Sequence, residues 1–156
     1  MKIKISKYDI FVNLTCLALL IGIVVYLVLF WNRIPDKIPG HYNAAGVVDR
    51  WGNKGELFVV PIVAWIMYIG LTILERFPQV WNTGVQVTEE NKERVYRILK
   101  NMISTEKLLM VAVFIFLTIN SSFSIGLPIW FLPVFLILMF GSLILFIISL
   151  IKTSKH

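Results

Sequence analysis

Two long hydrophobic runs restrict the folds that are open to this chain. Residues 10–31 and 128–151 are almost wholly apolar. The hydrocarbon core of a bilayer is about 30 Å thick, and a helix crosses it with about 20 apolar residues. A spanning helix also satisfies its own backbone hydrogen bonds inside lipid. Each run therefore predicts a transmembrane helix.

The composition supports the same class. Of the 156 residues, 58% are hydrophobic and 15% are charged, and the mean hydropathy is +0.80. These values are typical of integral membrane proteins and leave no room for a separate soluble domain. Lys and Arg outnumber Asp and Glu by 15 to 9. Because the basic residues flank hydrophobic segments, we interpret the excess as membrane orientation and predict no nucleic-acid partner.

Four spans are predicted, in one all-α transmembrane domain over residues 1–156. Their approximate ranges are 8–31, 57–75, 105–121 and 128–151. The N-terminal lysines resemble the start of a signal peptide, but the apolar run that follows is too long and has no small-residue cleavage site, which predicts an uncleaved helix.

The third span continues an amphipathic segment, residues 88–107. Its apolar residues follow helical spacing and charged residues occupy the other side, which predicts one helix from Thr88 to Asn120. Thr88 is a suitable N-cap. The amphipathic half has two interpretations: packing on the membrane surface or on a neighbouring helix, or docking a cytoplasmic protein partner.

Orientation follows from the distribution of Lys and Arg. With the N-terminus inside, eleven of these residues lie on the inner side and four on the outer side. The four outer residues are Arg33, Lys37, Arg50 and Lys54. We therefore expect a multi-pass cell-membrane protein with both termini in the cytoplasm. Residues 33–56 would form a structured outer cap between the first two spans.

The outer cap contains a polar segment, residues 34–51, punctuated by proline and glycine. Pro35 and Pro39 fix the backbone, and Gly46 permits a turn with positive φ. These three residues are interpreted as structural. The turn would bring Asp49 back toward His41. Such a pair either locks the loop or contributes to a ligand site.

Six residues of the cap are the candidate ligand contacts. His41, Asn43 and Asp49 would supply polar contacts, and Tyr42 and Trp51 would anchor at the interface; Lys54 completes the set. An extended backbone over residues 38–43 would point His41 and Asn43 to one side and Tyr42 to the other.

Enzymatic chemistry has little support in the sequence. No metal-binding, phosphate-binding or nucleophile motif is present, and the acids of the cap lack zinc-ligand spacing. We predict no catalytic residue, metal or cofactor. Asp9, Glu75 and Glu106 are interpreted as helix-end residues in the headgroup region, which argues against an ion-coupled transporter.

The segment Pro35-Asp36-Lys37-Ile38-Pro39-Gly40-His41-Tyr42-Asn43-Ala44-Ala45-Gly46-Val47-Val48-Asp49 resembles the signature of a bacterial membrane family, domain of unknown function 1648. The resemblance continues through Trp51, Lys54 and Pro61. Residues 88–91, with Arg94 and Tyr96, resemble a later segment of the family. The same domain forms the N-terminal part of SdpI-type immunity proteins.

The resemblance implies a non-enzymatic immunity or accessory protein that binds a membrane-active peptide toxin or a lipid at its outer face. Two alternatives stay open. One is a membrane sensor or regulatory subunit that signals through residues 88–107. The other is an outer-face membrane metallohydrolase.

Overall fold

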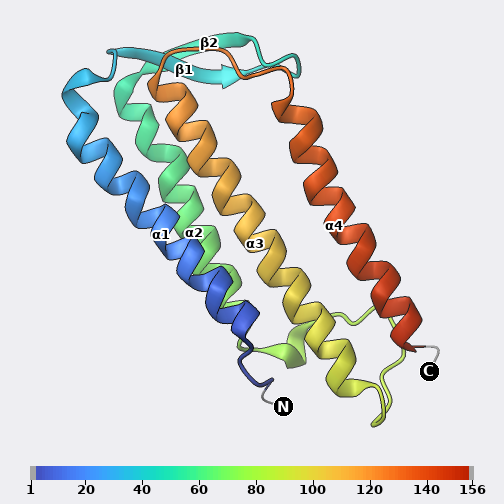
Figure 1. The fold of residues 1–156 in the computed structure, drawn as a ribbon. Helices are drawn as coiled ribbons and strands as arrows, with labels where there is room; N and C mark the ends of the chain where they lie inside the picture. The colour runs from blue at the N-terminus through green and yellow to red at the C-terminus, as the bar shows by residue number, and fades with distance from the viewer. Residues whose placement is uncertain (1–2, 155–156) are drawn as a thin grey trace.

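Four long helices run side by side, and a two-stranded hairpin covers one end of the bundle (Figure 1). The computed structural model describes residues 3–154. Both ends of the described chain lie at the end opposite the hairpin. The elements are α1 (Lys7–Phe30), β1 (Lys37–Tyr42), β2 (Val48–Asn53), α2 (Val59–Leu74), α3 (Lys92–Ser122) and α4 (Phe131–Ser154).

Each helix is long and apolar enough to cross a membrane. Including the short 3-10 turns that flank α1 and α2, the candidate spans are Lys7–Arg33, Lys54–Leu74, Lys92–Ser122 and Phe131–Ser154. The four predicted spans are therefore confirmed as helices by length and composition. A mostly helical membrane architecture follows from them.

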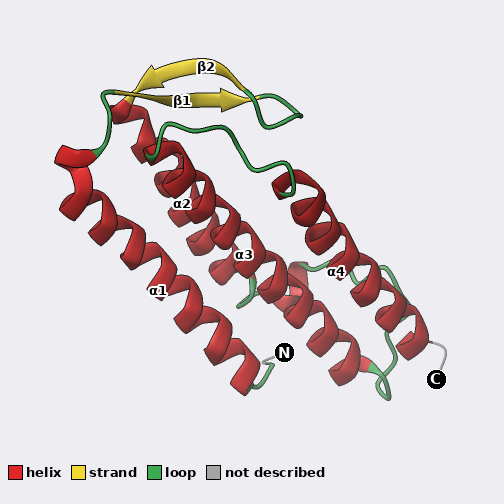
Figure 2. Ribbon diagram, turned by 45° about the horizontal axis from the view of Figure 1, so that its top comes forward, coloured by secondary structure: helices red, strands yellow, loops and turns green. Residues whose placement is uncertain are grey.

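The hairpin revises the expectation of an all-α chain. Strands β1 and β2 pair antiparallel between α1 and α2, above the helix ends (Figure 2). Buried Ile38 fixes β1 on the helices, and Gly46 closes the turn with φ of 77°. The predicted cap is structured, and its structure is a sheet.

Helix α3 is a single element, as predicted, but it begins at Lys92 instead of Thr88. The backbone N–H of Thr88 donates to Asn91 Oδ1 over 2.9 Å, and the backbone N–H of Asn91 donates to Thr88 Oγ1 over 3.3 Å. Reciprocal bonds of this kind satisfy the free donors of a helix start. Thr88 thus opens the turn that leads into the helix.

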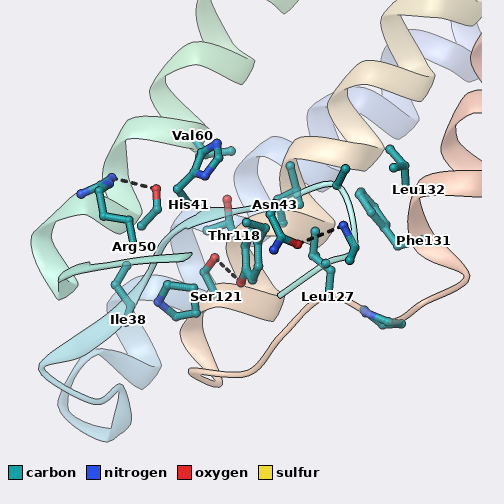
Figure 3. A pocket seen from close by; sticks show the side chains of 18 of the residues that line it. Ile38, His41, Asn43, Arg50, Val60, Thr118, Ser121, Leu127, Phe131 and Leu132 are labelled. Atoms are coloured by element: carbon teal, nitrogen blue, oxygen red, sulfur yellow. Dashed lines mark hydrogen bonds between the residues drawn. The ribbon is translucent and has the colours of Figure 1, made fainter. Parts of the chain in front are cut away.

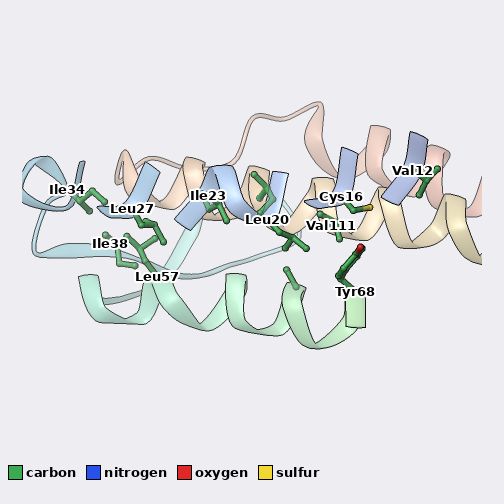
Figure 4. Packing of buried hydrophobic residues seen from close by; sticks show 12 residues of the cluster. Val12, Cys16, Leu20, Ile23, Leu27, Ile34, Ile38, Leu57, Tyr68 and Val111 are labelled. Carbon is green, nitrogen blue, oxygen red and sulfur yellow. The ribbon is translucent and has the colours of Figure 1, made fainter. Parts of the chain in front are cut away.

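The main core lies between α1, α2 and α3. One face of α1 carries buried residues at helical spacing, and the cluster continues up to the hairpin (Figure 4). Its α1 members are Val12, Cys16, Leu20, Ile23 and Leu27. Inside lipid such contacts act through van der Waals packing, because the alternative environment is equally apolar.

Helix α4 packs mainly against α3 and stands apart from α1 and α2 in Figure 1. Near the hairpin, the rings of Phe116 and Phe131 stack at 4.9 Å. At the opposite end, Leu150 of α4 is buried with Val95 and Leu99 of α3. The apolar side of the amphipathic segment is therefore covered by neighbouring elements, which favours the packing interpretation.

Candidate functional site

The hairpin brings His41 and Asp49 together, as the Gly46 turn predicts. His41 Nδ1 lies 2.6 Å from Asp49 Oδ1. The pairing of β1 and β2 contains two irregularities, and Gly40 and Asp49 are the extra residues on the two strands. A bulge redirects side chains locally. Here the result is an exposed His-Asp pair, with side chains 64% and 43% accessible.

The turn of the hairpin is locked internally and docks on the loop before α4. Asn43 Oδ1 accepts hydrogen bonds from the backbone N–H of Ala45 and Val47, over 2.9 and 3.0 Å. Gly46 O accepts from Leu127 N over 2.8 Å, and a Cβ at Gly46 would lie 2.8 Å from Leu127 O. Gly46 is thus required by its positive φ and by this close approach.

Tyr42 ties the hairpin to α3. Its hydroxyl is 2.9 Å from Ser121 Oγ and accepts from Asn120 Nδ2 over 3.1 Å. It also donates to the backbone O of Ile125 over 3.2 Å. Tyr42 was predicted to anchor at the interface, but its hydroxyl is engaged in contacts within the protein.

A pocket of about 720 Å³ lies beneath the hairpin, between α2, α3 and the start of α4 (Figure 3). Its walls are mostly apolar, with Leu57 and Val60 on one side and Leu117, Phe131 and Leu132 on the others. The volume falls in the range of about 300–1,000 Å³ that is usual for small-molecule sites. This cavity is the candidate ligand site.

The candidate residues divide between the pocket and its surroundings. His41, Tyr42 and Asn43 line the pocket, and so do Pro39 and Gly46. Four other predicted residues are not among the lining residues: Pro35, Asp49, Trp51 and Lys54.

Lys54 closes the base of the hairpin. Its Nζ donates to the backbone O of Trp31 and Ile34, over 3.3 and 3.4 Å, and lies 3.5 Å from Asp36 Oδ1. It also lies 5.0 Å from the centre of the Trp31 ring. These contacts hold the end of α1 against the segment that leads into α2.

Two charged residues that line the pocket, Arg50 and Glu56, were not among the predicted site residues. Arg50 Nη1 pairs with Glu56 Oε2 at 2.9 Å, and Arg50 Nη2 donates to Gly40 O over 2.7 Å. The guanidinium lies against Gly40, where a Cβ would meet Nη2 at 2.6 Å. The carboxylate of Glu56 lies against Gly52 in the same way, where a Cβ would clash with it. The only signal in the sequence was the opposite charge of Arg50 and Glu56, six positions apart.

A second feature absent from the sequence interpretation is a buried ion pair between α2 and α3. Lys107 Nζ lies 2.8 Å from Glu75 Oε1, and the side chains are 1% and 6% accessible. Lys107 also donates to Asn13 Oδ1 over 3.0 Å and to Thr72 Oγ1 over 3.2 Å. Ser104 Oγ donates to Glu75 over 2.9 Å. Every proton of the ammonium therefore has an acceptor.

Asp9 is held similarly at the start of α1. Its Oδ2 lies 3.1 Å from Arg97 Nη1 and 3.1 Å from Lys100 Nζ. Asp9 and Glu75 lie at helix ends, as the sequence predicts, but both acids face cations of α3 inside the bundle. Glu106 instead meets α4, where its Oε1 accepts from Ser142 Oγ over 2.6 Å. Helix–helix packing brings together residues that are far apart in sequence.

Over residues 3–154, no group of three or more His, Cys, Asp or Glu side chains is arranged to hold a metal ion. The metallohydrolase alternative therefore has no ligand set among these residues.

Comparison with known proteins agrees with part of the expected resemblance. Residues 18–65 match the family model described as Domain of unknown function (DUF1648). The matched range runs from the middle of α1 through the whole hairpin into α2. It therefore contains the signature segment. It also contains the lining residues on the hairpin side of the pocket, residues 38–46, Arg50 and Glu56, which we call the roof of the pocket.

A curated relative from Archaeoglobus fulgidus, described as an uncharacterized protein, is 32% identical over 78 residues. The match covers 45% of this chain and 41% of the relative, so the chain spans less than half of that protein's length. No solved structure gives a significant match. The chain carries a domain of unknown function and four helices that are long and apolar enough to make it a multi-pass membrane protein.

Proposed function

We propose that this protein is a non-enzymatic immunity or accessory protein of the bacterial cell membrane, which binds a membrane-active peptide or a lipid at its outer face. The observation that carries the proposal is the pocket beneath the hairpin. It combines apolar walls, built by segments that span the membrane, with a polar roof that contains His41, Asn43 and Arg50. An amphipathic ligand has the complementary chemistry.

The orientation is part of the proposal. Both ends of the described chain share one end of the bundle, and the basic residues concentrate there. The cytoplasmic side of membrane proteins is enriched in Lys and Arg. The hairpin and the pocket would then face outside, where a secreted peptide or an outer-leaflet lipid arrives. The resemblance to SdpI-type immunity proteins supports the same assignment.

The alternative of a sensor that signals through residues 88–107 has less support. The apolar side of this segment is covered by Leu150 and by Trp81, Val85 and Val87 of the preceding loop. A docking helix would present that side to its partner.

The test is tolerance of bacteria that express the protein to a panel of membrane-active peptides. Leu132→Trp fills the pocket from α4, whereas Ile137→Trp places the same ring on an exposed part of the same helix. We expect the wild type and Ile137→Trp to raise tolerance, and Leu132→Trp to lose the effect at equal protein level. Equal tolerance in all three strains and the empty host would refute the proposal.

A further inference from the structure

We infer that the ligand of the pocket is a phospholipid, with one acyl chain between α2 and α4 and its phosphate beside Arg50. This inference rests on the proposed function and names the ligand class of that site. It draws on three observations: where the pocket opens, which donors its roof leaves free, and how the roof is held.

The pocket opens toward the surroundings of the helices. Its lining includes Val59 of α2, which is 57% accessible, and Ile129 before α4, which is 90% accessible. Leu132 of α4 also lines it and is 37% accessible. In a membrane, apolar side chains exposed on spanning helices contact acyl chains. An acyl chain can therefore enter sideways without passing through water.

The roof offers unused hydrogen-bond donors at the polar end of that path. A guanidinium has five N–H donors in a planar fork. The structure gives Arg50 two partners, Gly40 O and the carboxylate of Glu56. The remaining donors match the oxygens of a phosphate, for which arginine is the preferred partner. Asn43 adds its amide N–H donors, because only its Oδ1 is engaged in the turn.

The roof is also held in place before a ligand arrives. The guanidinium lies across Gly40, and Glu56 lies across Gly52, so both side chains are fixed on the hairpin. A preformed site loses less conformational entropy on binding. The phosphate would therefore meet a cation whose position is already set.

A peptide is the competing occupant. It would bring backbone N–H and C=O groups into the pocket, and these groups need partners there. On the α3 and α4 side, the pocket is lined by the apolar side chains of Leu117, Phe131 and Leu132. The hydroxyls of Thr118 and Ser121 also line it, but they are already engaged with Phe114 O and the Tyr42 hydroxyl. A hydrocarbon chain makes no such demand, which favours the lipid.

The experiment is photo-crosslinking of the purified full chain in nanodiscs of phosphatidylethanolamine and phosphatidylglycerol. The probe is phosphatidylcholine with a diazirine on one acyl chain, and its matched control is diacylglycerol with the same labelled chain. Labelled peptides are identified by mass spectrometry. We expect phosphatidylcholine to label the pocket segments of α3 and α4 about tenfold more than diacylglycerol, because only its phosphate can accept charge-assisted hydrogen bonds from Arg50.

Two variants separate the contribution of the acyl chain to binding from that of the phosphate. Arg50→Gln should lower phosphatidylcholine labelling to the diacylglycerol level, while Leu132→Trp should remove pocket labelling by both probes. Ile137→Trp should leave both unchanged. Labelling that is equal for the two lipids, or that is spread evenly along α4 and insensitive to Leu132→Trp, would overturn the inference.

The outcome is distinguishable from failure of the proposed function. If tolerance to a peptide depends on Leu132 but the lipids do not label the pocket, the ligand is the peptide and only the inference fails. If phosphate-dependent labelling occurs in a protein that gives no tolerance, the immunity role fails and the lipid site stands.

Discussion

Replacing Lys107 by methionine tests whether the buried ion pair holds the bundle together. The ammonium is enclosed between α1, α2 and α3 with three acceptors, and its loss leaves Glu75 with Ser104 as its hydrogen-bond donor. Removing one partner of a buried pair costs about 3–5 kcal/mol, because the other charge stays desolvated. We expect Lys107→Met and Glu75→Leu each to lower the free energy of unfolding by about this amount.

The double variant Glu75→Leu/Lys107→Met should lose much less stability than the sum of the two single losses. It removes both charges, and the remaining cost is about 1 kcal/mol for each hydrogen bond that Asn13, Thr72 and Ser104 no longer make. The coupling energy of the cycle should therefore exceed about 3 kcal/mol. Lys152→Met, near the exposed end of α4, is the matched control and should change stability by less than about 0.5 kcal/mol.

The assay is reversible unfolding of the purified protein in mixed micelles by titration with sodium dodecyl sulfate, followed by tryptophan fluorescence. Single variants that each lose less than about 1 kcal/mol would refute the reasoning, because they would show that neither charge is desolvated by the bundle. A double variant whose loss equals the sum of the two single losses would refute it equally, since it would show that the residues do not interact.

Three further predictions concern the hairpin and the orientation. Gly46→Ala should destabilise the protein more than Gly84→Ala in the same titration: both positions have positive φ, but only the first meets a neighbouring backbone. Tyr42→Phe should cost about 1 kcal/mol and speed hydrogen exchange in the hairpin turn, because it breaks the bonds to α3; unchanged exchange would argue against this tie. In intact cells, an impermeant thiol reagent should label Ala44→Cys and not Gln86→Cys. The native Cys16 is buried and should not react. The reverse pattern would show that the protein has the opposite orientation.

The helices and the His-Asp pair could be predicted because each depends on nearby sequence. An apolar run of twenty residues specifies a spanning helix wherever it lies in a chain. Gly46, with Asn43 three positions before it, closes a turn short enough to return Asp49 to His41. The sheet was missed because β1 contains a proline and a glycine, which weaken the usual strand pattern.

The ion pairs between helices could not be predicted, because they depend on how the helices are aligned. Lys107 lies 32 positions after Glu75, and their contact requires the packing of α2 on α3. By charge alone, Lys107 was counted among the basic residues of the cytoplasmic flank. The Arg50–Glu56 pair is closer in sequence, but its position on the pocket roof depends on Gly40 of the other strand.

The two polar features lie in different parts of the bundle and share no residue. The ion-pair cluster joins α1, α2 and α3, whereas the pocket is bounded by the hairpin, α2, α3 and α4. Effects of substitutions at independent sites add, and those at shared sites do not. A Leu132→Trp substitution combined with the Glu75/Lys107 double variant should therefore show the sum of the separate stability changes. Any excess would mean that α4 and the three-helix core respond to each other, and that the pocket and the ion pair act together.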